Sequence, residues 1–440
     1  MSLNDTHLNS WRDYQKGLRK AARRRYLLRR VPLFTLYLFL VVVLYTASWL
    51  FAHLGPADHQ PLELREGGRP WGKRLKKQDL PTLLRQLDLN LNPVQKSYIL
   101  AKEGTKLSIE TSLDPALQSY ILKLLRRSLT SQAAVVVLKP NTGQILAMAS
   151  YGRNGTEKKE NLCLQANYPA ASLFKIVSAA AAIEARGFTP DRPAVFRGRR
   201  HTLYRSQLKP NKGRYTRKTS FRKAFSSSIN PVFGIIGIYD LGRELMTQYA
   251  NKFMFDQEIP FDLPVGKSHI MVPEDDYGLA EMASGFNKKT LISPLHASLI
   301  TAAVTNSGTI LEPWLVKKIK AESGEISYRA RRSKLARPIK ENTAKELRIL
   351  MRDTVLHGTV RSAFRPLRRK KLFRNMELGA KTGTINDHRD QYKYDWLTAY
   401  ALPDKGDGGI CITVLAIHGS KLGIRAKDLA RLIINYHFTS

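Results

Sequence analysis

An alanine-rich run with a serine and a lysine at its start constrains the fold of this chain more than any other stretch. Residues 170–183 read Ala-Ala-Ser-Leu-Phe-Lys-Ile-Val-Ser-Ala-Ala-Ala-Ala-Ile, and the helix-ending residues Gly187 and Pro190 follow. Because apolar residues occupy nearly every side, the pattern predicts a helix buried all round. A spacing of three places Ser172 and Lys175 on one face of its first turn.

A hydroxyl beside a buried amine is a pair that catalysis can use. Burial disfavours the ammonium form and lowers the pKa of a lysine. A neutral amine can then accept the hydroxyl proton, which makes the serine oxygen a nucleophile. A chance pair is the competing interpretation, because the same spacing recurs at Ser206–Lys209 and Ser220–Lys223. The apolar setting is what singles out Ser172.

Composition limits the classes of protein to which the chain can belong. Its 440 residues include 72 Lys+Arg and 36 Asp+Glu, a net charge of +36. Such an excess favours anionic partners: nucleic acid, lipid headgroups or an acidic polymer. With two cysteines there is neither a disulfide framework nor a metal-ligand cluster, so we expect no metal and no other cofactor. A Cys163–Cys411 bridge would fit, but we favour two independent buried thiols.

An uncharged stretch near the N-terminus predicts a membrane anchor. Residues 1–30 carry nine Lys/Arg, and the 22 residues from 31 to 52 carry no charge. A helix of that length spans about 33 Å, which suffices to cross a bilayer. The basic flank places the N-terminus in the cytoplasm and the rest of the chain outside it. A cleaved signal peptide is the alternative, but the apolar segment is long and lacks a clear small-x-small cleavage site.

The remaining sequence predicts a stalk and one globular domain. We expect a stalk with short structured pieces at 53–106, where prolines recur, and the domain at 107–440. In the domain a helix should start at Asp114-Pro115, and a hairpin should span 133–149. Helical patterns lie at 229–255, 279–286, 293–307 and 422–438, and strand patterns at 396–401 and 410–417. This order predicts an α+β fold, with helices around an antiparallel sheet.

Two more motifs follow the serine–lysine pair. Ser228-Ile229-Asn230 begins 56 residues after Ser172, and Lys381-Thr382-Gly383-Thr384 begins 153 residues after Ser228. Ser-x-Asn arises easily by chance, whereas Lys-Thr-Gly occurs once in this chain. The ordered set is much more specific than any member.

This ordered set resembles the signature of penicillin-binding proteins and serine β-lactamases. The resemblance runs from about residue 107 to the C-terminus and includes the segments 111–118, 133–149, 168–172, 292–295 and 357–359. It implies an antiparallel sheet of about five strands flanked by helices, in which the three motifs form an acyl-transfer site.

The resemblance also implies a role for each residue of the first two motifs. Ser172 would attack the carbonyl of a D-Ala-D-Ala terminus, or of a β-lactam that mimics it, and Lys175 would take the proton. Ser228 would relay that proton to the leaving amine. Asn230 would hold Lys175 and the substrate amide.

The third motif would bind the substrate's terminal carboxylate through Lys381, Thr382, Gly383 and Thr384, and Lys381 would help to keep the catalytic amine neutral. The backbone N–H groups of Ser172 and Thr384 would form the oxyanion hole. The chain also departs from the pattern of this family. Residues 53–107 are too short for the glycosyltransferase domain of bifunctional members, and a large pedestal domain is missing or reduced. The middle residue Ile229, in place of the aspartate of many β-lactamases, argues against efficient β-lactam hydrolysis.

We therefore expect a serine D,D-transpeptidase that cross-links peptidoglycan stem peptides and is acylated by β-lactams. It would sit in the inner membrane on one span, with its domain in the periplasm. A D,D-carboxypeptidase and a penicillin-binding sensor or scaffold are the alternatives. Cell-wall synthesis proteins are candidate partners, whereas export argues against a nucleic-acid partner. Two basic runs without acids, 197–223 and 361–374, are either surfaces for anionic lipid or wall polymer or solvated faces.

Overall fold

The computed structural model describes residues 74–85, 94–102, 105–153, 161–209, 216–406 and 408–440. All of them belong to one unit, Trp71–Ser440. The expected cytoplasmic tail, the expected anchor at 31–52 and much of the stalk lie outside the described residues. None of the helices in the described part has the length and apolar character needed to cross a membrane.

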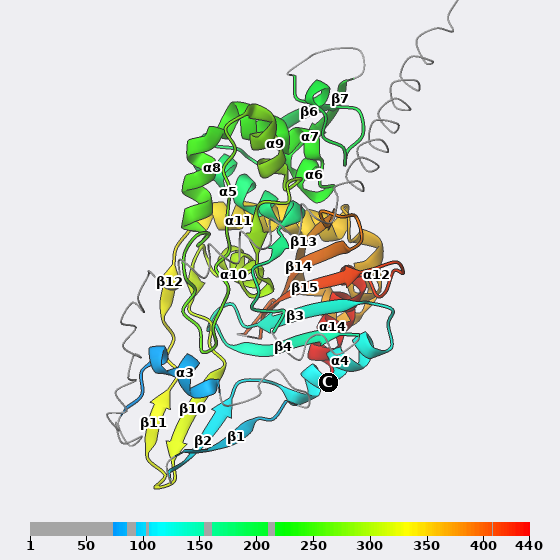
Figure 1. Ribbon diagram of the computed structural model, residues 1–440. Helices are drawn as coiled ribbons and strands as arrows, with labels where there is room; N and C mark the ends of the chain where they lie inside the picture. The colour runs from blue at the N-terminus through cyan, green and yellow to red at the C-terminus, as the bar shows by residue number, and fades with distance from the viewer. Residues whose placement is uncertain (1–73, 86–93, 103–104, 154–160, 210–215, 407) are drawn as a thin grey trace, which may run out of the picture. The chain divides into compact units, whose positions relative to one another are not determined.

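A five-stranded antiparallel sheet in the order β13-β14-β15-β3-β4 forms the centre of the unit (Figure 1). The expected antiparallel sheet flanked by helices is thus confirmed, and the expected hairpin at 133–149 is the β3–β4 pair. The strand that carries Lys381–Thr384, β13, lies at one edge of the sheet. The five strands are β3 (Gln132–Leu138), β4 (Ile145–Gly152), β13 (Met376–Asn386), β14 (Lys393–Pro403) and β15 (Ile410–His418).

Side chains of this sheet alternate between two buried layers. Val136 and Trp396 pack with one set of helices, whereas Val135 and Leu397 pack with the other. Because both faces are covered, β3, β4 and β15 are apolar at almost every position, and all of β15 is buried. The first layer contains α5 (Lys175–Arg186), α10 (Pro294–Thr305) and α11 (Glu341–Leu356); the second contains α4 (Pro115–Arg126), α12 (Arg361–Arg369) and α14 (Ala426–Thr439).

The alanine-rich run forms a 3₁₀ turn, η3 (Ala171–Phe174), which leads directly into α5. All residues of α5 from 175 to 183 are buried, as the apolar pattern predicted. The helix ends at Gly187, whose φ of 64° is left-handed. We expected Ser172 in the first α-helical turn, but it lies in the tighter turn before that helix, and a spacing of three in 3₁₀ geometry still aligns it with Lys175.

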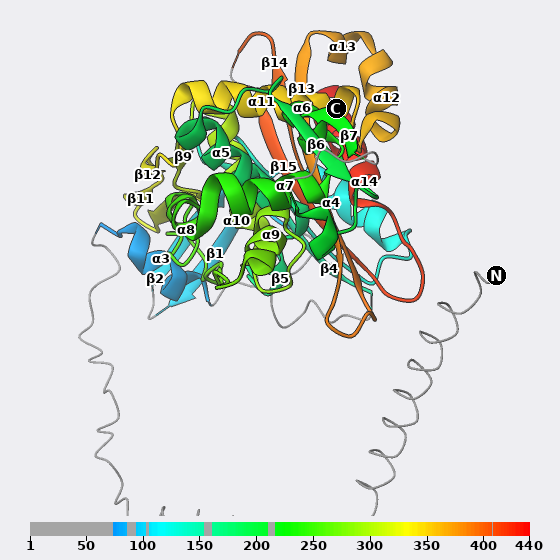
Figure 2. The same cartoon turned by 90° about the horizontal axis from the view of Figure 1, so that it is seen from above.

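Further helices lie above the alanine-rich helix α5 in Figure 1, and the view from above shows them in front of the central sheet (Figure 2). The continuous helix expected at 229–255 has three pieces: an α-helical piece passes into a π-helical turn at Ile236, and Gly242, with φ of 65° and ψ of −178°, interrupts the helical path before the last piece. These helices are α6 (Phe221–Ser226), α7 (Asn230–Ile235), η5 (Ile236–Leu241), α8 (Gly242–Lys252) and α9 (Asp276–Ser284).

A second, four-stranded antiparallel sheet has the order β1-β2-β10-β11. It joins strands from both sides of the boundary that we placed at 106/107, and none of its four strands was predicted. Its strands are β1 (Ser97–Lys102), β2 (Thr105–Thr111), β10 (Val316–Ala321) and β11 (Ile326–Arg329). The short elements are η1 (Lys77–Asp79), α3 (Leu80–Leu84), β5 (Tyr168–Pro169), β6 (Pro193–Arg197), η4 (Arg205–Gln207), β7 (Thr216–Ser220), β8 (Leu291–Ile292), β9 (Ile310–Leu311), β12 (Lys334–Ala336) and α13 (Lys371–Arg374).

The two cysteines and the second basic run have clear places in this fold. Cys163 and Cys411 are both free and buried, which confirms two independent thiols. Burial raises the pKa of each thiol to about 12. The run at 361–374 forms α12 and α13, which bury Phe364 and Phe373 and keep most of their arginines and lysines at the surface.

Candidate active site

A cavity of about 300 Å³ brings the three predicted motifs together. It lies against the edge strand β13, between that strand and the start of α7. The two motif lysines, Lys175 and Lys381, are fully buried beside it. The other six predicted site residues line it: Ser172, Ser228, Asn230, Thr382, Gly383 and Thr384.

Lys175 is the centre of a small polar cluster. Its Nζ lies 2.9 Å from Ser172 Oγ and 2.8 Å from Asn230 Oδ1. It also donates a hydrogen bond to the carbonyl of Ser284, the last residue of α9. Among the residues that the structure describes, no carboxylate bonds this amine. Burial lowers the pKa of Lys175 well below its ordinary value, and the positive charge of Lys381 lowers it further.

Lys381 reaches the same cavity from β13. Its Nζ donates to Ser228 Oγ over 3.0 Å and to the Thr382 carbonyl over 2.8 Å. Burial lowers its pKa to about 7. The hydroxyl of Thr382 lies 2.8 Å from that of Thr359, so the hydroxyl of Thr359 is fixed beside the third motif.

Close backbone approaches fix the position of the serine. A Cβ on Gly383 would lie 3.3 Å from the backbone nitrogen of Ser172, so β13 runs directly against the 3₁₀ turn. A Cβ on Gly285 would lie 1.9 Å from the carbonyl oxygen of Ala171. Ala171 and Ser228 have φ values of 49° and 53°, a left-handed conformation that non-glycine residues seldom adopt.

Sequence reasoning missed several groups at the cavity. The Ser284 carbonyl gives no side-chain signal. His201 lines the cavity from the first basic run. Burial lowers the pKa of this imidazole, a hydrogen bond to the Ser228 backbone opposes that change, and Lys175 and Lys381 add to it. Because His201 belongs to a basic run, its sequence context gives no sign that it lies beside the nucleophile.

The far end of the cavity is cationic. Arg425 and Lys427, from the start of α14, line it together with Asp395 of β14. Burial alone would raise the pKa of Asp395, but the nearby His418 imidazole and the hydrogen bonds from Arg425 and the Ala426 N–H outweigh it and hold that pKa below its ordinary value. Arg425 Nε donates to the Asp395 carboxylate over 2.6 Å, which fixes the guanidinium at the cavity wall. Among the described residues, no three His, Cys, Asp or Glu side chains are grouped so that they could hold a metal ion.

Comparison with protein families finds one match that includes most of the cavity-lining residues. The model of the penicillin binding protein transpeptidase domain matches residues 133–422. The chain is 24% identical over 307 residues to Stage V sporulation protein D of Bacillus subtilis, covering 67% of this chain and 46% of that protein. It is 25% identical over 333 residues to Peptidoglycan D,D-transpeptidase PbpA of Mycobacterium tuberculosis, covering 67% and 64%. It thus spans less than two thirds of either relative.

Solved structures share the fold at lower identity. Penicillin-binding protein A from M. tuberculosis, in a ceftriaxone acyl-enzyme complex, has a TM-score of 0.61 and 22% identity, with 76% of this chain and 80% of that chain covered. The D,D-transpeptidase domain of a peptidoglycan glycosyltransferase from Eggerthella lenta has a TM-score of 0.60 and 22% identity, with 74% and 82% covered.

Proposed function

The chain belongs to the penicillin-binding protein transpeptidase family, and on that premise we propose that it is a serine D,D-transpeptidase. It acts on the D-Ala-D-Ala ends of peptidoglycan stem peptides and is acylated by β-lactams. The observation that carries this proposal is the 2.9 Å contact between Ser172 Oγ and a fully buried lysine amine.

The surroundings of Lys175 decide the direction of its proton transfer. A neutral amine has two N–H donors and one lone pair. Asn230 Oδ1 and the Ser284 carbonyl can only accept hydrogen bonds, so they occupy the two N–H groups. The third neighbour is Ser172 Oγ. The lone pair therefore faces the Ser172 hydroxyl, and Lys175 can serve as the general base.

Acylation then proceeds in two proton transfers. Ser172 Oγ forms a bond to the carbonyl carbon of the penultimate D-alanine, and its proton passes to Lys175. The tetrahedral oxyanion is stabilised by the backbone N–H groups of Ser172 and Thr384. Ser228 Oγ, held by Lys381, relays a proton to the departing nitrogen as the C–N bond breaks. An acceptor amine later releases the acyl group.

The third motif binds the substrate carboxylate. Lys381 supplies the charge, and Thr382 and Thr384 supply hydroxyls at the cavity wall, with Gly383 allowing β13 to approach the serine turn. The same charge disfavours the ammonium form of Lys175, so the carboxylate binder also supports the base. This double use fits the placement of two lysines in one buried cluster.

The topology completes the proposal. Residues 31–52 form a single span, residues 1–30 stay in the cytoplasm, and a stalk leads from the span to the unit that begins at Trp71. This unit, which contains the domain expected at 107–440, then faces the periplasmic side of the inner membrane, where stem peptides are cross-linked. The basic flank of the uncharged stretch supports this orientation.

Acylation by a labelled penicillin tests the proposal. Wild-type protein should gain one covalent label, and Ser172→Ala should abolish it. Ser298→Ala is the matched control, because Ser298 is a buried serine of α10 that bonds the Pro294 carbonyl away from the cavity, and it should label normally. No labelling of the wild type would overturn the assignment.

Products identify the acceptor. Incubation with muropeptides that carry pentapeptide stems should yield cross-linked dimers and release D-alanine. Trimmed tetrapeptides without dimers would assign the chain as a D,D-carboxypeptidase. Stable acylation with neither product would assign it as a sensor or scaffold.

A further inference from the structure

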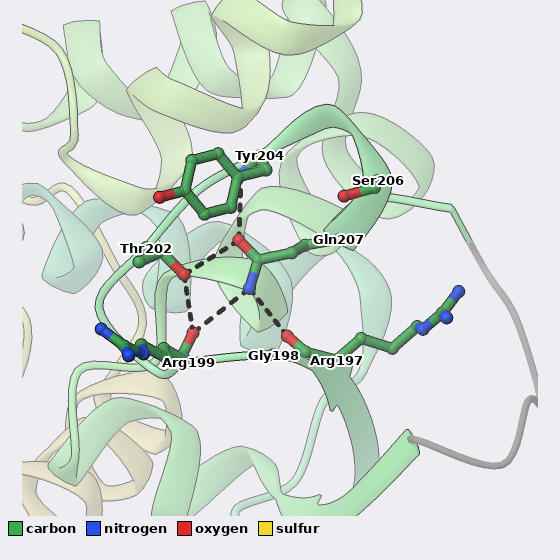
Figure 3. A pocket seen from close by; sticks show the side chains of 7 residues that line it. All are labelled: Arg197, Gly198, Arg199, Thr202, Tyr204, Ser206 and Gln207. Carbon is green, nitrogen blue, oxygen red and sulfur yellow. Dashed lines mark hydrogen bonds between the residues drawn. The ribbon is translucent and has the colours of Figure 1, made fainter. Parts of the chain in front are cut away.

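One buried glutamine fixes the loop between β6 and η4. The side chain of Gln207 donates to the carbonyls of Arg197 and Arg199 at 2.7 and 3.3 Å. It accepts from the Thr202 hydroxyl at 3.1 Å and from the Tyr204 backbone N–H at 2.9 Å. Figure 3 shows these bonds around one amide, which is only 5% exposed.

The loop is shaped around this amide. Gly198 has a φ of 70°, and a Cβ there would lie 2.8 Å from Gln207 Nε2. The amide has one orientation, because both carbonyls need its N–H groups and the backbone N–H of Tyr204 needs its oxygen. Arg200 and His201 form the middle of the loop, and Gln207 thus bonds the residues on both sides of them.

The middle of the loop holds Asn230. The backbone N–H of Asn230 donates to the Arg200 carbonyl over 2.8 Å, and its Nδ2 donates to the His201 carbonyl over 3.1 Å. A carbonyl only accepts, so Nδ2 has to face His201. Asn230 Oδ1 is consequently the atom turned toward Lys175.

We propose that Gln207 is a positioning residue for acylation: it fixes the loop whose His201 carbonyl orients the Asn230 amide, and that orientation leaves the Lys175 lone pair for Ser172. This inference rests on the proposed function. If the amide turned over, Nδ2 would meet the Lys175 amine. The lone pair would then accept that N–H and would no longer face Ser172.

Gln207→Met removes the four hydrogen bonds while nearly preserving side-chain volume. Saturation kinetics with a fluorescent penicillin separate the binding constant from the first-order acylation rate. We expect the acylation rate to fall at least tenfold, with the binding constant changed less than threefold. Gln118→Met is the matched control, because Gln118 is a buried amide of α4 that bonds both backbone groups of Met148 at 2.9 Å, away from the cavity. It should acylate at the wild-type rate.

The pH profile separates positioning from simple destabilisation. In Gln207→Met the ammonium form of Lys175 loses the acceptor Asn230 Oδ1, so the acid limb of the acylation rate should move to lower pH. It should not move in Gln118→Met. Lys381 on β13 and His201 on the loop are the other titratable groups near Lys175, and both variants retain them.

Two results are decisive. Folded Gln207→Met that acylates within twofold of wild type, with an unshifted acid limb, would overturn this inference while leaving the proposed function intact. If neither wild type nor Gln118→Met is labelled, the proposed function is overturned instead. Should Gln207→Met fail to fold, Thr202→Val removes one bond to the amide and should slow acylation about threefold. Wild-type kinetics of Thr202→Val would then overturn the inference.

Discussion

Lys175 and Lys381 are both fully buried, yet their neighbours differ. Lys175 contacts two obligate acceptors and one hydroxyl, and a second lysine lowers its pKa in addition to burial. Lys381 contacts one hydroxyl and one carbonyl, and burial lowers its pKa to about 7. The charge of Lys381 thus acts on the pKa of Lys175 in the same direction as burial, which favours the neutral form of Lys175. These differences fit the roles of Lys175 as the base and of Lys381 as the residue that binds the substrate carboxylate.

Lys381 should make the stability of the protein depend on pH. Its folded-state pKa is about 7, below the ordinary value of 10.5. Between these values the unfolded chain binds one more proton, so the free energy of unfolding rises with pH, by about 1.4 kcal/mol per unit. Below pH 7 the full cost of the buried ammonium is present.

In urea unfolding between pH 7 and 10, the free energy of unfolding of Lys381→Met should rise less steeply with pH than that of wild type, by the contribution of one proton. The exposed Lys371→Met should leave the slope unchanged. Parallel profiles for wild type and Lys381→Met would mean that Lys381 stays protonated in the folded protein.

The end of α9 positions the nucleophile turn. Its last carbonyls, which have no partner within the helix, are satisfied by α5: Ser178 bonds the Ala283 carbonyl and Lys175 bonds the Ser284 carbonyl. Gly285 then adopts a left-handed φ of 63° against the Ala171 carbonyl. A helix far along the chain therefore helps to fix both the base and the turn that carries Ser172.

Gly285→Ala should disturb this contact. A Cβ would lie 1.9 Å from the Ala171 oxygen, so the turn must move, and acylation should fall at least a hundredfold. Gly187→Ala is a matched control: it also caps a helix with φ near 64°, but nothing lies within 4 Å of its Cβ. That variant should lose about 1–2 kcal/mol of stability and retain acylation. Equal acylation by both variants would contradict the role given to α9.

Local pattern predicted some elements well and others poorly. Residues 170–183 and 396–401 carry strong apolar patterns, and the helix and strand were found there. The expected helix at 229–255 ignored Gly242, whose backbone breaks it. The order of the central sheet and the pairing of β2 with β10 depend on contacts between distant segments, which periodicity does not encode.

The residues of the site show the same division between local signals and tertiary contacts. Side chains with chemical signatures, such as Ser172, Lys175 and Lys381, were named from spacing, and the structure brings them together. The carbonyls of Ser284 and His201 were not predicted, because every residue has a carbonyl and only the tertiary fold brings these two to the site. The sequence was sufficient to identify the reacting groups. The carbonyl acceptors that orient them could be identified only from the structure.

At the scale of the whole molecule, the cavity is built entirely from residues of the unit Trp71–Ser440. The segments before it carry the uncharged stretch 31–52 and a basic tail. Attachment to the membrane and acylation should therefore be separable.

A protein that starts at Trp71 should be acylated within twofold of the full-length rate but should remain in the supernatant after ultracentrifugation. The full-length protein should sediment with membranes and resist extraction at alkaline pH. Full-length protein in the supernatant would exclude the proposed span. A large loss of acylation in the shorter protein would show that the first 70 residues support the cavity.

Both cysteines lie in the core with their thiol pKa raised to about 12. The native protein is therefore nearly inert to maleimides, since the thiolate is the reactive form. A single cysteine introduced at the exposed Arg199 of the same loop would carry a fluorophore without background labelling. Its emission could then follow, in real time, whether the loop beside the nucleophile moves when an antibiotic enters.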